Sequence, residues 1–84
     1  MFEVLEELIK TVRERKNASA DKSYTKKLLE DKNLCREKVM EEIQELTEAI
    51  DNQKNQIHEA ADVFYHLLTL LEANGVNAED VCKN

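Results

Sequence analysis

Acidic side chains at two places in the sequence have the spacing of a carboxylate metal site. Glu41, Glu42 and Glu45 lie in one short stretch, and Glu59 and Asp62 follow further along the chain. Residues three or four apart share one face of a helix, so each group would present its acids on one side. Two such faces brought together would surround a single point with oxygen ligands, which hard cations such as Mg²⁺ or Mn²⁺ prefer.

The chemistry that suits such a site is metal-assisted hydrolysis of a polyphosphate. The sequence has no Ser-His-Asp arrangement, glycine-rich phosphate loop or zinc-binding cluster. Divalent cations would neutralise the phosphates and lower the pKa of a bound water, and a glutamate could accept that water's proton. The chain carries 12 basic and 18 acidic residues, a net charge of −6, so bare phosphate would be repelled unless metal screened it.

Other interpretations of these residues stay open. Acid pairs on helices are usually solvated, and the same pattern would suit a non-catalytic helical dimerisation module. Lys38 could pair with Glu42 four residues on, or could contact a phosphate beside the metal. We expect His66 to pack, or to support a ligand from behind, rather than to bind the metal.

Hydrophobic periodicity predicts that helices carry these acids, within an all-α bundle of four to five helices. Ser23 and Asn77 are predicted N-caps, Asn33 is a further candidate, and Asn74-Gly75 predicts a left-handed helix end. Polar residues 17–22 and 51–55 predict loops. The expected helices are Phe2–Lys16, a short one ending at Glu30, Leu34–Asp51, Gln56–Ala73 and Ala78–Cys82.

A helical wheel orients the acids relative to the apolar stripes, at about 100° per residue. In the third helix the stripe runs through Cys35, Val39, Ile43, Leu46 and Ile50. Glu42 borders this stripe, Glu45 flanks it and Glu41 points away. The fourth helix is apolar nearly all round, except for a polar stripe of Glu59, Asp62 and His66 that Asn55 extends by a turn. An all-round apolar helix is normally buried on most sides, so in a short chain it predicts completion by a homodimer.

Length and composition exclude several classes of protein. The 84 residues, with one Gly, no Pro and no Trp, suit one domain (1–84) and disfavour sheet-rich folds. The acidic balance argues against a nucleic-acid partner. No apolar run approaches the roughly 18 residues of a membrane span, and the acidic N-terminus does not resemble a signal peptide. Cys35 and Cys82 lack metal-binding spacing, and two lone thiols suggest the cytoplasm.

Several segments together resemble a known enzyme family. The acid motifs and their separation are similar to those of the all-α nucleoside-triphosphate pyrophosphatase (MazG-like) superfamily. Residues 23–28 (SYTKKL), 38–42 (KVMEE), 59–68 (EAADVFYHLL) and 74–76 (NGV) resemble more specifically the phosphoribosyl-ATP pyrophosphohydrolases, from about Leu5 to Val81. The sequence departs from that pattern at Met40, where Gly is common, at Ile43, where Ala is common, and in the loop 17–22, which lacks a proline.

The resemblance implies a cytoplasmic, dimeric, Mg²⁺-dependent hydrolase acting on an acid anhydride. It would cleave phosphoribosyl-ATP to phosphoribosyl-AMP and pyrophosphate, the second step of histidine biosynthesis. By the same resemblance Glu41 and Glu42 are catalytic acids, Glu41 in an accessory, water-orienting role. The implied metal ligands are Glu42, Glu45, Glu59 and Asp62. The implied substrate contacts are Arg15, Lys16, Ser23, Tyr24, Lys27 and Lys38.

A house-cleaning MazG-like nucleoside-triphosphate pyrophosphatase is the alternative enzyme. The Ser23-Tyr24-Thr25 segment favours the histidine-pathway enzyme, because the generic pyrophosphatases need not have it. Many relatives are fused to a cyclohydrolase domain, and we expect this chain to be too short to include one.

Overall fold

The computed structural model describes residues 2–15 and 23–84, and within these ranges it contains helices and no strand. The predicted all-α class is therefore confirmed. Lys16 and the predicted loop 17–22 lie outside the described residues. The helices are α1 (Phe2–Glu14), α2 (Tyr24–Glu30), α3 (Lys32–Asn52), α4 (Gln56–Ala73) and α5 (Ala78–Lys83).

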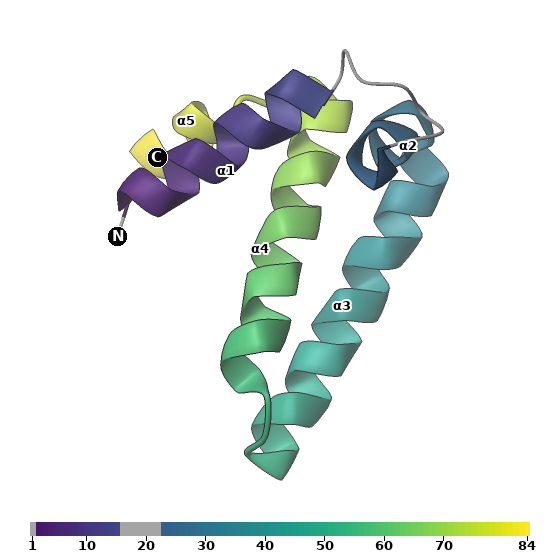
Figure 1. The fold of residues 1–84 in the computed structure, drawn as a ribbon, viewed down its shortest axis with the longest axis vertical. Helices are drawn as coiled ribbons and strands as arrows, with labels where there is room; N and C mark the ends of the chain where they lie inside the picture. The colour runs from purple at the N-terminus through teal and green to yellow at the C-terminus, as the bar shows by residue number, and fades with distance from the viewer. Residues whose placement is uncertain (1, 16–22) are drawn as a thin grey trace.

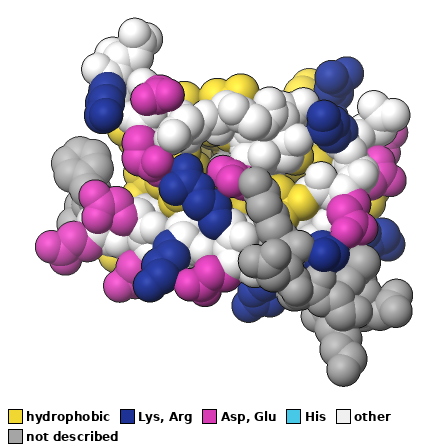
Figure 2. Space-filling model, turned by 90° about the horizontal axis from the view of Figure 1, so that it is seen from above, with side chains coloured by type: hydrophobic (Ala, Val, Ile, Leu, Met, Phe, Trp, Pro, Cys, Tyr) yellow, Lys and Arg dark blue, Asp and Glu magenta, His cyan; other side chains and the backbone are white. Residues whose placement is uncertain are grey.

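The long helices α3 and α4 lie side by side as the antiparallel arms of a hairpin (Figure 1). α2 packs against both arms at the end where α3 begins, and α1 crosses the end of α4 with α5 beside it. Acidic and basic side chains are interspersed around apolar ones on the face seen from above in Figure 2. None of the described helices combines the length and apolar character that crossing a bilayer requires.

Side-chain caps explain where the short helices begin. Ser23 accepts a hydrogen bond from the Lys26 backbone N–H at 3.2 Å, and Asn77 accepts one from Glu79 at 2.9 Å, as predicted. The prediction for Asn33 is wrong. Asp31 caps α3 instead, accepting from the Leu34 N–H at 3.0 Å, so α3 begins at Lys32 and follows α2 almost without a break.

α4 ends in a Schellman motif, as the Asn74-Gly75 pair predicted. The Val76 N–H donates to the Leu71 carbonyl at 2.9 Å, and the Gly75 N–H donates to Glu72 at 3.2 Å. Gly75 has φ +71°, the left-handed conformation that glycine adopts without strain. This corner returns the chain so that α5 packs against α4 and approaches α1.

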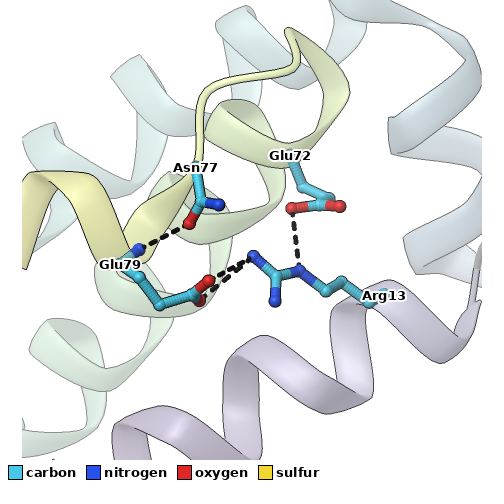
Figure 3. Close-up of polar contacts among 4 residues, drawn as sticks. All are labelled: Arg13, Glu72, Asn77 and Glu79. Carbon is cyan, nitrogen blue, oxygen red and sulfur yellow. Dashed lines mark hydrogen bonds and ion pairs between the residues drawn. The ribbon is translucent and has the colours of Figure 1, made fainter.

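Arg13 ties α1 to this corner. Its guanidinium lies between two carboxylates, with Nε at 3.3 Å from Glu72 of α4 and Nη2 at 3.0 Å from Glu79 of α5 (Figure 3). The hydrogen bond to Glu79 is the main cause of the raised pKa of Arg13. One side chain of α1 therefore joins it to two helices at the other end of the sequence.

The apolar core is concentrated at the end of the hairpin that α1, α2 and α5 cover. α3 buries Cys35 and Val39 there, whereas Ile43 and Ile50 further along are 43% and 54% exposed. The expected inward stripe is thus buried only in its first half, because the short helices do not extend along the hairpin. The buried apolar residues are Ile9, Val12, Leu28, Cys35, Val39, Ala49 and Ala78.

A single chain does not bury α4 on most sides, and the expectation that a second copy completes its burial stays a prediction. Its buried residues are His66 and Thr69, and Phe64 and Leu67 are 58% and 40% exposed. α4 still contacts each of the other four helices. It is central to the fold while leaving one apolar face uncovered.

Candidate metal centre

Three of the predicted metal ligands meet between the arms of the hairpin. Glu42 and Glu45 lie one turn apart on α3, and Glu59 lies in the first turn of α4. Each offers a carboxylate oxygen, and these oxygens lie within 4.8 Å of one another. The antiparallel pairing of α3 and α4 therefore brings these three carboxylates together, as their spacing predicted.

The surroundings of Glu42 and Glu59 favour the neutral carboxyl more than water does. One oxygen of Glu42 and one of Glu59 are buried without a hydrogen-bond partner among the described residues. Burial raises the pKa of both carboxyls, and the neighbouring charge of Glu45 raises them further. Unpaired buried carboxylate oxygens are costly, and a bound cation would remove that cost.

Asp62, the fourth predicted ligand, belongs to an adjoining group. A second set of candidate ligand atoms, again within 4.8 Å of one another, comes from His58, Glu59 and Asp62. His58 Nε2 lies 3.5 Å from Asp62 Oδ2. Glu59 is common to both groups, so the acids form two adjacent clusters rather than the single point expected.

Sequence reasoning missed His58 as part of the site. Its four-residue separation from Asp62 was the available signal, because such a pair shares one helix face. It also missed Lys54, which lines an open hollow of about 240 Å³ together with Glu45 and Glu59. Asn55, predicted to extend the polar stripe, lines the same hollow.

Glu41 points away from the acids, as the helical wheel predicted. It is exposed, and its carboxylate pairs with Lys38 Nζ at 3.2 Å. Lys38 therefore does form an ion pair on α3, but its partner is Glu41 and the predicted partner Glu42 is wrong. The hydrogen bond to Glu41 is the main cause of the raised pKa of Lys38, and Tyr24 and Glu42 lie close enough to raise it further.

The remaining predicted contacts are distributed unequally around the acids. Tyr24 is half exposed and lies near both Lys38 and Glu42. Ser23 is buried and its hydroxyl oxygen caps α2, which matches the structural role considered for it. Arg15 and Lys27 are exposed, and no described contact joins them to the acid clusters.

His66 packs behind the acids, as expected, and is not a member of either ligand group. It is buried, with Nδ1 at 2.7 Å from the Asp62 carbonyl oxygen and Nε2 at 3.0 Å from the Tyr24 hydroxyl. Beside it, the Thr25 hydroxyl hydrogen-bonds the Tyr65 hydroxyl. These two side-chain bonds fasten α2 to α4 next to the candidate centre.

Comparison with known proteins identifies the family of this chain. The model of the phosphoribosyl-ATP pyrophosphohydrolase family matches residues 5–84. The chain belongs to this family. Glu42, Glu45, Glu59, Asp62 and the α2 segment all lie within the matched range.

The curated relatives differ widely in length, and the chain spans only a small part of the longer ones. A phosphoribosyl-ATP pyrophosphatase of Cereibacter sphaeroides is 43% identical over 81 residues, which cover 93% of this chain and 79% of the relative. A histidine biosynthesis trifunctional protein of Kluyveromyces lactis is 46% identical over 77 residues, covering 92% of this chain but only 10% of the relative. A bifunctional histidine biosynthesis protein of Schizosaccharomyces pombe is 38% identical, with 18% of its length covered. No solved structure matches.

Two departures from the phosphoribosyl-ATP pyrophosphohydrolase pattern lie on the same surface. Met40 and Ile43 are 64% and 43% exposed on α3. They therefore leave the packing of the acids intact and enlarge the apolar surface of the hairpin beside them.

Proposed function

We propose that this chain hydrolyses phosphoribosyl-ATP to phosphoribosyl-AMP and pyrophosphate, the second step of histidine biosynthesis. The observation that carries the proposal concerns a member of this family in which one carboxylate oxygen of Glu42 and one of Glu59 are buried. Neither oxygen has a hydrogen-bond partner in the described part of the chain. The printed name of the C. sphaeroides relative describes the same activity. A cytoplasmic location accompanies this proposal, and the free thiols of Cys35 and Cys82 are consistent with it.

We further propose Mg²⁺, with Mn²⁺ as the alternative ion, as the cofactor of this site. The donor set fits, because carboxylate oxygens are what these hard cations bind. Glu42, Glu45, Glu59 and Asp62 would hold the metal, with His58 beside them. When bound, such a cation screens a polyphosphate and lowers the pKa of a coordinated water.

Within this mechanism the chain's own residues would divide the work as follows. The raised pKa of Glu42 brings its carboxylate closer to the range in which it can take a proton from the attacking water. Glu41 would act from outside the cluster, by holding Lys38 toward the substrate phosphates. Tyr24 and Lys38 are the best-placed substrate contacts, while Arg15, Lys16, Ser23 and Lys27 are proposed on family resemblance.

We propose a homodimer formed through the uncovered apolar face of the hairpin. Ile43 and Ile50 on α3 are seven residues apart, as are Ile57 and Phe64 on α4, and all four are exposed. Seven-residue spacing places each pair on one side of its helix. A second copy of the chain would bury both stripes, and it would complete the core that α1, α2 and α5 leave unfinished. Sedimentation velocity of wild type against Phe64→Glu tests this, with Val4→Glu on α1 as the control.

The direct test of the proposed reaction is pyrophosphate release from phosphoribosyl-ATP, with Mg²⁺ and after chelation. We expect release with Mg²⁺ and loss of it in excess EDTA. Turnover of dCTP or dUTP, with none of phosphoribosyl-ATP, would instead indicate the house-cleaning pyrophosphatase. Equal Mg²⁺ affinity of wild type, Glu42→Gln and Asp62→Asn in calorimetry would indicate a non-catalytic dimerisation module.

A further inference from the structure

His66 is held on both sides of its ring, and this fixes which nitrogen carries the proton. A carbonyl oxygen can only accept a hydrogen bond, so Nδ1, 2.7 Å from the Asp62 carbonyl, must be the N–H donor. In a neutral imidazole the other nitrogen then has no hydrogen. Nε2, 3.0 Å from the Tyr24 hydroxyl, is therefore an acceptor.

The Tyr24 hydroxyl must consequently donate its hydrogen bond to His66. A phenol has one hydrogen to donate, and its oxygen can also accept. With the proton directed to Nε2, only lone pairs remain for any other partner. Burial raises the pKa of Tyr24 above its ordinary value of 10.0, so the phenol stays protonated at neutral pH.

The ring of Tyr24 is fixed against α4 as well as bonded to it. Its centroid lies 5.8 Å from that of His66, in an edge contact, and 6.4 Å from that of Tyr65, in a stacked one. Tyr24 is nevertheless 47% exposed and close to Lys38 and Glu42. The Tyr24 side chain is thus partly exposed beside Glu42, where it could contact a nucleotide bound at the acid cluster.

We propose that His66 is a positioning residue that makes Tyr24 a hydrogen-bond acceptor for a sugar hydroxyl of the substrate, and not a donor to its phosphates. Ionised phosphate oxygens can only accept, so they cannot pair with a hydroxyl whose proton is already used. Sugar hydroxyls can donate. This assignment rests on the proposed function. It gives Tyr24 and Lys38 different roles, because the Lys38 ammonium is suited to bind the phosphates.

Kinetics of Tyr24→Phe, His66→Leu and the double variant test the assignment. Loss of one hydrogen bond predicts a rise in KM for phosphoribosyl-ATP of about three- to tenfold in each single variant, with kcat little changed. Because His66 acts through Tyr24, the double variant should resemble either single one. His66→Gln, whose amide oxygen can replace Nε2 as the acceptor, should recover most of the loss. Additive effects of the two substitutions would overturn the proposal.

Pyrophosphate serves as the probe for the phosphate side of the site. Its inhibition constant should be the same in wild type and Tyr24→Phe, and it should rise in Lys38→Met. An equal loss of pyrophosphate and substrate affinity in Tyr24→Phe would mean that Tyr24 contacts phosphate, which contradicts the assignment.

The tautomer itself can be measured without any turnover. In long-range ¹H–¹⁵N spectra of the full chain at about pH 8, His66 should carry its proton on Nδ1. Assignment by comparison with His66→Gln distinguishes it from His58. A proton on Nε2 would overturn the proposal even if the enzyme is active. If phosphoribosyl-ATP is not turned over, the proposed function fails, and this spectrum alone decides how Tyr24 is bonded.

Discussion

The acids at the two ends of α4 have opposite surroundings. Near its beginning, Glu59 faces Glu45 and Glu42 of α3, and one oxygen of Glu59 is buried without a partner among the described residues. Near its end, Glu72 is held by Arg13 of α1, which also pairs with Glu79 of α5 (Figure 3). The first end of α4 therefore belongs to a cluster of three acids, and the second end to an acid pair bound by an arginine.

Helix electrostatics makes this difference informative. Glu59 lies at the positive end of the helix dipole, where an acid is favoured, and Glu72 lies next to the negative end, where it is disfavoured. The disfavoured acid is the one that the fold supplies with a cation. At the other end, burial and the charge of Glu45 raise the pKa values of Glu42 and Glu59, and His66 and His58 offset this only in part. We infer that the Glu72 and Glu79 pair held by Arg13 serves stability, and that the cluster of Glu42, Glu45 and Glu59 serves a ligand.

Exchanging one carboxylate for an amide at each end gives the largest expected contrast. Glu59→Gln should reduce Mg²⁺-dependent pyrophosphate release by about a hundredfold or more, because a ligand shared by both acid groups is lost. Glu79→Gln, the matched control, should keep near wild-type activity and lower the melting temperature by a few degrees. Comparable activity losses in the two variants would remove the distinction between the ends.

The pH dependence of stability without metal sharpens the same contrast. The fold raises the pKa values of Glu42 and Glu59, so it binds their protons more tightly than the unfolded chain does. The resulting stability is present at low pH and is lost as pH rises through the raised values, above the ordinary 4.5. In EDTA, the stability of wild type relative to Glu42→Gln should therefore fall as pH increases over this range.

Melting curves at a series of pH values provide the measurement. Glu79→Gln is again the control, since its carboxylate lies outside the cluster, and its difference from wild type should vary less with pH. A Glu42→Gln difference that is flat with pH would show that the cluster is not strained in the absence of metal.

The smallest effect is expected at the corner between α4 and α5. Gly75 has φ +71° and open space around an added Cβ, so Gly75→Ala meets backbone strain without a clash. We expect a loss of about 1 kcal/mol in the free energy of unfolding, measured with urea, and unchanged activity. Gly75→Asn should lose less, because Asn tolerates this conformation better. A loss of activity in either variant would mean that the corner influences the distant acids.

The sequence predicted what depends on local spacing. Glu42 and Glu45 were placed by helical periodicity, α4 was bounded correctly by its polar turn and its Gly75 end, and Ser23 was recognised as a cap. Asn33 was preferred over Asp31 because both types cap helices, and only the packing of α2 against α3 determines where the chain turns.

Contacts between distant segments were beyond these local rules. The Arg13 bridge spans 66 residues to Glu79, and the Tyr24–His66 bond spans 42. Neither follows from periodicity, because each depends on how α1 and α2 cross the hairpin. The division of the four acids into two clusters likewise depends on how α3 and α4 are placed against each other. The spacing of residues along one helix does not determine that placement.

The turn at residues 53–55 bears on the order in which the molecule folds. Gln53 and Asn55 both take left-handed conformations there, with φ 54° and 61°, and reverse the chain within a few residues. Closing so short a loop loses little entropy, so α3 and α4 can pair early in folding, whereas Arg13 can reach Glu79 only after nearly the whole chain has been gathered. The part of the molecule that assembles most readily is thus the part in which like charges repel most. Metal present during folding would accordingly speed the pairing of this hairpin more than the docking of α1.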